Sequence, residues 1–219
     1  MKISREWLSD YVTLPAELTP EQLSHDLTLK TVEVEHVVDT SDDLVLEIDN
    51  KSLTNRPDLW GHIGIARELA TIYQRPLSAL ESAVPPATVD GLVEIDDAER
   101  CRRFAAVSFD MPRRVETPAW MARRLKQVGE YVGLFLVDLS NYVMLATGQP
   151  NHVYDRDLVS LPLTVVAGGN EPLELLSGAK VDVRALSVIR DADRAVGLAG
   201  VMGALDSGVG PGTLRAVLE

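Results

Sequence analysis

Apolar and polar residues in the first part of the chain follow a helix pattern and then a strand pattern. Thr19 is a good helix N-cap, with Pro20 at the first helical position and Gln22 three residues after the cap. Residues 31–38 alternate between apolar and polar side chains, which is typical of a half-buried strand. Residues 44–48 form a short apolar run that predicts a second strand.

A second helix is predicted over residues 57–73. Ile63, Ala66 and Leu69 recur at helical spacing, and Pro76 ends the pattern. Residues 78–91 then contain two adjacent prolines and several small residues, which indicates a linker. We therefore expect a small N-terminal α/β domain over residues 1–85 and a second domain over residues 86–219.

The rest of the chain mixes both periodicities. Helices are predicted over 117–128 and 138–147, the second with Gly148 just past its end. Strands are predicted over 92–95, 103–109, 163–166, 186–189, 196–201 and 214–218. Since the elements do not alternate regularly as β-α units, the predicted fold class is α+β, with mixed sheets and helices.

Composition excludes several classes of protein. Of the 219 residues, 46% are hydrophobic and 25% are charged, the balance of a soluble globular protein. The net charge of −12 argues against a free-standing, high-affinity nucleic-acid binder, because phosphate binding needs a basic face. No apolar run is long enough to cross a membrane, and the N-terminus lacks the apolar core of a signal peptide. We expect a cytoplasmic protein with neither a membrane nor a DNA partner.

The sequence gives little indication of a metal site or of a catalytic nucleophile. Cys101 is the only cysteine, and the four histidines lack the spacing of metal ligands, so no metal site is predicted. The standard phosphate-binding and serine-hydrolase motifs are also missing. Two segments stand out: residues 141–152 end in an amide and an imidazole after Pro150, and residues 198–204 form an apolar run with several small residues. Spacing alone favours a cap and turn for the first and a core strand for the second.

The motifs of the chain resemble those of a known family. Residues 55–62 read NRPDLWGH, residues 148–152 read GQPNH, and residues 198–203 read LAGVMG. Together with residues 3–8 and 137–144, they resemble the β subunit of bacterial phenylalanyl-tRNA synthetase, in the same order along the chain. The resemblance covers essentially the whole chain.

This resemblance implies an N-terminal domain followed by a B3/B4 editing domain. In the family, a tRNA-binding OB-type domain is inserted after the first helix-strand unit, whereas here Val38 leads through one acidic turn to Leu44. The catalytic-like core of the family is also missing, so the resemblance implies neither amino-acid activation nor a cofactor. The B3/B4 domain of the synthetase hydrolyses tyrosine wrongly attached to the phenylalanine tRNA.

The resemblance also assigns site residues. His152 and Asn141 are the candidate catalytic residues. The implied substrate-binding residues are Ser140, Pro150, Ala199, Gly203 and Glu219. Glu219 matches a glutamate that recognises the tyrosine hydroxyl, and a buried carboxylate would reject the analogue that lacks this hydroxyl because the carboxylate would stay unpaired.

The sequence thus predicts a stand-alone relative of the synthetase β chain that hydrolyses a mischarged, tyrosine-type aminoacyl-tRNA or a related aminoacyl ester in trans. The alternative is a non-enzymatic module that binds an aromatic amino acid, RNA or a protein. The candidate partners are the aminoacylated 3′ end of tRNA, a protein partner or a second copy of the chain. Three arginine pairs, 102–103, 113–114 and 123–124, are either a local RNA-facing patch or solvated surface.

Overall fold

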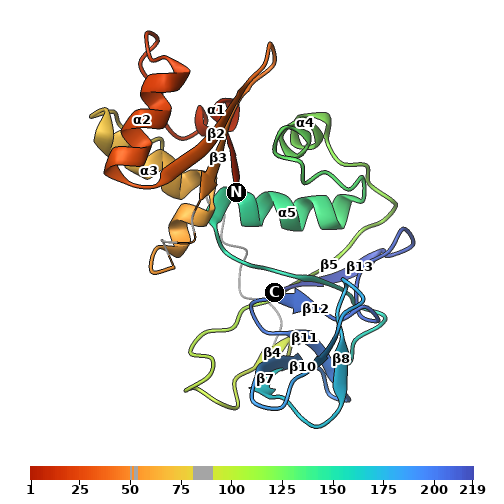
Figure 1. The fold of residues 1–219 in the computed structure, drawn as a ribbon. Helices are drawn as coiled ribbons and strands as arrows, with labels where there is room; N and C mark the ends of the chain where they lie inside the picture. Colours follow the sequence, from red (N-terminus) through yellow and green to blue (C-terminus); the bar gives the residue numbers. More distant parts are fainter. Residues whose placement is uncertain (50, 52–53, 81–90) are drawn as a thin grey trace. The chain divides into compact units, whose positions relative to one another are not determined.

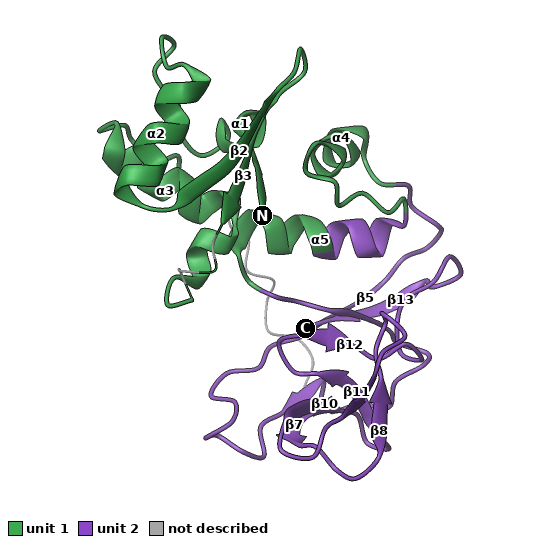
Figure 2. Cartoon of the chain, in the orientation of Figure 1, with its two compact units in different colours: residues 1–83, 117–133, 141–149 green, residues 84–116, 134–140, 150–219 purple. Residues whose placement is uncertain are grey.

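The computed structural model describes residues 1–49, 51, 54–80 and 91–219 and has an α+β fold. The chain divides into two compact units (Figure 2). Unit 1 comprises residues 1–83, 117–133 and 141–149, and unit 2 comprises residues 84–116, 134–140 and 150–219. The single domain boundary predicted near residue 85 falls within 81–90, outside the described residues.

Unit 1 contains a three-stranded antiparallel sheet and most of the helices. Its elements are β1 (Lys2–Ser4), α1 (Arg5–Leu8), α2 (Pro20–Lys30), β2 (Glu33–Asp39), β3 (Leu44–Asp49), the 3-10 helix η1 (Pro57–Trp60), α3 (His62–Ile72), α4 (Ala119–Val128) and the second half of α5 (Phe135–Thr147). The strand order is β1-β3-β2. Helices α2 and α3 lie beside this sheet (Figure 1).

The core of unit 1 follows from the apolar periodicity. Leu23 and Leu27 of α2 pack with Leu46 of β3 and with Leu69 of α3, and all four are fully buried. The predicted N-cap is confirmed, because the hydroxyl of Thr19 accepts a hydrogen bond from the Gln22 N–H at 3.2 Å.

The predicted helix over residues 57–73 is broken at Gly61. The backbone of Gly61 is extended, with φ −142° and ψ 160°, and separates η1 from α3. A Cβ at Gly61 would lie 2.3 Å from the Gly148 nitrogen at the end of α5. The sequence periodicity continues through this position, but a close backbone approach interrupts the helix there.

Unit 2 consists mainly of short strands. They are β4 (Val93–Glu94), β5 (Val107–Asp110), β6 (Val153–Asp155), β7 (Leu163–Ala167), β8 (Pro172–Glu174), β9 (Lys180–Asp182), β10 (Ser187–Arg190), β11 (Ala195–Leu198), β12 (Met202–Gly203) and β13 (Arg215–Leu218). They form a five-stranded sheet in the order β12-β11-β10-β7-β4, a three-stranded sheet in the order β5-β13-β6, and the pair β8-β9. Only β4 and β7 pair in parallel among the described strands.

Two predicted elements differ from the structure of this region. Helix α5 begins at Phe135 rather than Asp138, so Ser140 and Asn141 lie inside the helix and not at its start. The strand predicted over residues 196–201 ends at Leu198, and Gly200, with φ +69°, lies in the turn that leads to β12. A left-handed backbone at glycine turns the chain back, and the result is a β-hairpin.

Among the described residues, every helix is too short or too polar to cross a bilayer.

Candidate active site

The candidate site is built on the antiparallel pair β6 and β13 of unit 2. Val217 lies opposite Tyr154, and the Glu219 N–H donates a 3.0 Å hydrogen bond to the carbonyl oxygen of His152. Successive side chains of a strand point to opposite faces, whereas residues opposite each other on paired strands share a face. His152, Tyr154, Val217 and Glu219 therefore occupy one face of this sheet.

Two glycines on neighbouring strands lie against the rings of this face. Gly197 of β11 pairs with Gly203 of β12. A Cβ at Gly203 would lie 2.1 Å from Nε2 of His152, and a Cβ at Gly197 would lie 3.2 Å from the hydroxyl oxygen of Tyr154. The absence of side chains at both positions lets the imidazole and the phenol approach the strands closely.

The polar ends of three side chains in this cluster are buried without a partner. The rings of His152 and Tyr154 meet edge to face, with centroids 4.5 Å apart. Nε2 of His152, Oη of Tyr154 and Oε2 of Glu219 make no hydrogen bond within the part of the chain that the structure describes. A buried polar atom without a partner costs about 1–3 kcal/mol, and these three atoms are therefore the basis of the candidate site.

Burial sets the protonation of the cluster. It lowers the pKa of the His152 imidazole to about 4, which makes the ring neutral at pH 7. Burial raises the pKa of the Glu219 carboxyl to about 7, and the nearby Tyr154 hydroxyl offsets part of this rise. Burial, and after it the charge of Glu219, raises the pKa of Tyr154 above 10, so the phenol keeps its proton. The site thus holds a neutral imidazole, a phenol and a half-ionised carboxyl near neutral pH.

The other predicted site residues differ in burial and in hydrogen-bond partners. The Ser140 hydroxyl donates to Oδ1 of Asn151 at 2.7 Å, and Asn141, which belongs to unit 1, donates through its amide to the Glu130 carbonyl at 3.1 Å. Pro150 is exposed, whereas Ala199 is half-buried against the apolar cluster that contains Tyr154. Of the predicted residues, His152, Gly203 and Glu219 belong to the cluster at the β6–β13 face, and Ala199 packs against the apolar residues around Tyr154.

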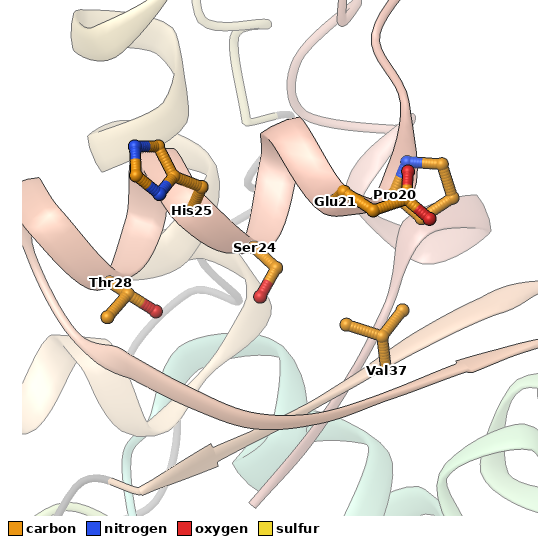
Figure 3. Close-up of a pocket in the computed structure, with 6 residues that line it drawn as sticks. All are labelled: Pro20, Glu21, Ser24, His25, Thr28 and Val37. Carbon is orange, nitrogen blue, oxygen red and sulfur yellow. The ribbon is translucent and has the colours of Figure 1, made fainter.

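Two surface hollows are lined by other residues. One, of about 400 Å³, lies in unit 1 and is lined by Pro20, Glu21, Ser24, His25, Thr28 and Val37 (Figure 3). Ser24 points from α2 toward the strand that carries Val37 (Figure 3). The other, of about 230 Å³, lies between β8 and β9 in unit 2 and is lined by Asn170, Pro172, Lys180, Val181, Asp182 and Arg184. Neither hollow is lined by a predicted site residue.

Among the described residues, no three His, Cys, Asp or Glu side chains come together in a group that could hold a metal ion.

His62 has a structural role. Its Nε2 accepts a hydrogen bond from the Ser4 N–H at 3.1 Å, and its Nδ1 lies 2.8 Å from the Leu145 carbonyl oxygen. An accepting Nε2 leaves the proton on Nδ1, so His62 is a neutral bridge between β1 and the end of α5.

Tyr154 and Gly197 are the members of the cluster that the sequence analysis missed. Both lie in short strands whose partners the sequence does not specify. The spacing of His152 and Tyr154, with one residue between them, is the signal that could have placed both side chains on one face of a strand. A glycine inside an apolar strand, such as Gly197, likewise indicates a close approach by another group.

Fold and site together define a chain with an α+β fold, in which a buried imidazole, phenol and carboxyl share one sheet face. A comparison with protein families identifies the family to which the chain belongs. The model described as "B3/4 domain" matches residues 100–219, more than half of the chain, and the chain belongs to this family.

The relatives of the chain are β subunits of phenylalanine–tRNA ligase. The subunit from Solibacter usitatus is 38% identical over 182 residues, which cover 81% of this chain and 24% of that protein. The subunit from Rhodopirellula baltica is 33% identical over 226 residues, covering 100% of this chain and 33% of that protein. The chain therefore spans about a quarter to a third of the length of these relatives.

A solved structure also aligns with the whole chain. It is an N-terminal fragment of the phenylalanyl-tRNA synthetase β subunit from Pyrococcus horikoshii, at 15% identity and a TM-score of 0.44, and the alignment covers 66% of that fragment.

Proposed function

We propose that the chain hydrolyses a tyrosine-type aminoacyl ester in trans, either a mischarged aminoacyl-tRNA or a related ester. The observation that carries this proposal is the buried carboxyl of Glu219, whose Oε2 has no hydrogen-bond partner among the described residues, beside the neutral imidazole of His152. Membership of the B3/4 family and the resemblance to the synthetase β subunit support the same assignment.

Glu219 would select the substrate. Its ionised carboxyl can accept a hydrogen bond from a phenol, whereas a phenylalanine ring would leave a buried acceptor unpaired. A site built around such a bond rejects the analogue without the hydroxyl far more strongly than an apolar pocket could. The preference for tyrosine over phenylalanine is therefore assigned to this carboxyl.

His152 would hold the attacking water. Water adds to the ester carbonyl carbon, the bond to the ribose oxygen breaks, and that oxygen leaves with a proton as the free hydroxyl. A neutral imidazole can accept a hydrogen bond from the water through one ring nitrogen, and positioning of this kind accelerates hydrolysis. Asn141, the other catalytic residue that the resemblance implies, donates its amide to the Glu130 carbonyl within unit 1, so the proposal is built on His152 and Glu219.

The test is the release of tyrosine from tyrosyl-tRNA(Phe) by the purified chain. His152→Ala is expected to lower the rate at least about 10²-fold, which is the usual contribution of a positioned catalytic group. Glu219→Gln is expected to lower the rate on the tyrosyl ester at least about tenfold, because the substrate hydroxyl loses its ionised acceptor. His36→Ala and Glu174→Gln are the matched controls, because both side chains are exposed and lie outside the site.

The outcomes separate the two candidate functions. Equal rates in the wild type, the two site variants and the buffer would refute hydrolysis. Tight binding of tyrosine without turnover would instead favour a non-enzymatic module that binds aromatic amino acids.

A further inference from the structure

The position of Tyr154 is set by the core of unit 2. The residue is fully buried and packs in one cluster with Val159, Leu163, Ile189, Val196 and Val217. Its hydroxyl oxygen reaches the backbone of Gly197, where an added Cβ would lie 3.2 Å away. Because the ring is held by packed side chains, its hydroxyl points to a fixed place in the site.

The phenol and the carboxyl next to it interact with each other but form no hydrogen bond of good geometry. Tyr154 and Glu219 share one face of the β6–β13 pair and lie close enough for each to shift the pKa of the other. Even so, within the described residues neither the Tyr154 oxygen nor Oε2 of Glu219 has a hydrogen-bond partner of good geometry. The protein thus presents one buried donor and one buried acceptor next to each other.

A hydroxyl group matches this pair. It donates one proton and accepts through its lone pairs, so a single hydroxyl can donate to the carboxylate and accept from the phenol at once. A hydrogen or methyl group in the same place would leave two buried polar atoms unpaired instead of one. The second unpaired atom would increase the discrimination beyond what the carboxylate alone provides.

We propose that Tyr154 is a second specificity-determining residue, whose hydroxyl donates to the oxygen of the substrate hydroxyl while Glu219 accepts the proton of that hydroxyl. The proposal rests on the proposed function and defines its substrates as aminoacyl esters whose side chain ends in a hydroxyl. Tyr154 takes no part in bond breaking, and its effect is on the choice of substrate.

The test variant is Tyr154→Phe, which removes one oxygen and keeps the ring in the core. Binding of tyrosinamide and phenylalaninamide is measured by calorimetry, since neither probe has an ester to hydrolyse. The wild type is expected to prefer tyrosinamide, and Tyr154→Phe is expected to reduce this preference at least about tenfold, as loss of a buried hydrogen bond predicts. Tyr131→Phe is the matched control, because its ring is 38% exposed and belongs to unit 1.

A second variant keeps the hydroxyl but displaces it. Gly197→Ala places a methyl group 3.2 Å from the phenol oxygen, so the ring must move by a few tenths of an ångström. We expect a smaller loss of preference than in Tyr154→Phe. Circular dichroism of both variants shows whether the fold persists, and a change in preference counts only for variants with the wild-type spectrum.

Each outcome decides the role of Tyr154. An unchanged preference in Tyr154→Phe, or no binding of either probe by the wild type, would overturn it. Tighter binding of tyrosinamide by Tyr154→Phe would also overturn it, because it would mean that in the wild type the Tyr154 hydroxyl occupies the place of the substrate hydroxyl. Hydrolysis of tyrosyl and phenylalanyl esters, assayed in parallel, separates the two proposals. If Tyr154→Phe loses the preference for tyrosinamide and the wild type hydrolyses neither ester, this inference is supported and hydrolysis is refuted. If the wild type hydrolyses the esters and Tyr154→Phe leaves the ratio of the tyrosyl and phenylalanyl rates unchanged, hydrolysis is supported and this inference is refuted.

Discussion

At the scale of single residues, Glu219 is a carboxyl that folding makes harder to ionise. Its folded pKa of about 7 lies above the ordinary value of 4.5. Below pH 4.5 both states hold the proton. As the pH rises toward 7, the unfolded chain releases this proton while the folded chain keeps it, so the folded state loses stability across this window.

Glu219→Gln removes this pH-dependent penalty. We expect the free energy of unfolding of the variant, relative to the wild type, to rise by about 2 kcal/mol between pH 4.5 and 7.5, a value reduced because the side chain is not fully buried. Urea denaturation at both pH values measures it. Glu174→Gln, an exposed substitution, should show no such trend, and a constant difference for Glu219→Gln would contradict the buried carboxyl.

Two buried histidines change the stability with pH in the opposite direction to Glu219. Burial lowers the pKa of both His62 and His152 to about 4 in the folded chain, against an ordinary value of 6.5. Each therefore supports stability above pH 6.5, and this support is lost as the pH falls toward 4. NMR titration of the imidazole signals should give midpoints near 4 for both. A midpoint near 6.5 for His62 would contradict its role as a neutral bridge between Ser4 and Leu145.

The charged residues of the motif at residues 55–58 make contacts that the residue types alone do not predict. The sequence motif at residues 55–58 is typical of a helix start with Asp58 near the cap. In the structure, Asp58 lies in the first turn of η1, and its carboxylate also binds Arg56 through two 2.9 Å hydrogen bonds and Arg67 at 3.2 Å. Arg56 also binds Glu68 at 2.7 Å. These pairs join residues on either side of Gly61, a contact that local capping rules do not describe.

At the scale of elements, sequence patterns succeed where local chemistry decides. The Thr19 cap and the left-handed Gly148 just past the end of α5 follow from local rules, and both are observed. The break at Gly61 and the start of α5 at Phe135 could not be read from periodicity. In the case of Gly61, the cause is a backbone contact with residues more than eighty positions away, which no local rule contains.

Gly61→Ala tests this contact. The added Cβ would lie 2.3 Å from the Gly148 nitrogen and 2.6 Å from the Thr147 carbonyl carbon, and backbone atoms cannot move aside as a side chain could. We expect a loss of about 3 kcal/mol in unfolding free energy, typical of a severe steric clash. Thermal and urea denaturation measure it. Gly212→Ala is the control, because no atom lies within 4 Å of its added Cβ; equal stability of the two variants would refute the contact.

At the scale of the whole molecule, the sequence predicted the fold class and the family, and the site residues stay a prediction. Long motifs in a constant order identify the family, and the α+β class is observed. The site depends on which strand pairs with which, and strands of two to four residues carry too little pattern to specify their partners. His152, Gly203 and Glu219 are implied by the resemblance to the family, whereas Tyr154 and Gly197 follow only from the strand register.

The charge of the molecule leads to a prediction about the substrate. The net charge is −12, and Arg123 and Arg124, one of the three arginine pairs, form ion pairs with Glu6 and Asp10. A protein that makes 6–10 phosphate contacts loses about 10³–10⁵ in affinity between 50 and 200 mM salt, because bound counterions are released. A chain of this net charge, in which one of the three arginine pairs is already ion-paired, should recognise the aminoacyl end of its substrate and make little use of the tRNA body.

We therefore expect the chain to hydrolyse tyrosyl-tRNA(Phe) and a tyrosyl ester of adenosine at rates within about tenfold of each other. Raising the salt from 50 to 200 mM should change the rate on tyrosyl-tRNA less than about tenfold, which corresponds to one or two phosphate contacts. Arg123→Gln should leave both rates unchanged, since its partner is Glu6 rather than a phosphate. A steep loss of activity on tyrosyl-tRNA with salt, with the adenosine ester unaffected, would show that the tRNA body binds to a surface that the net charge conceals.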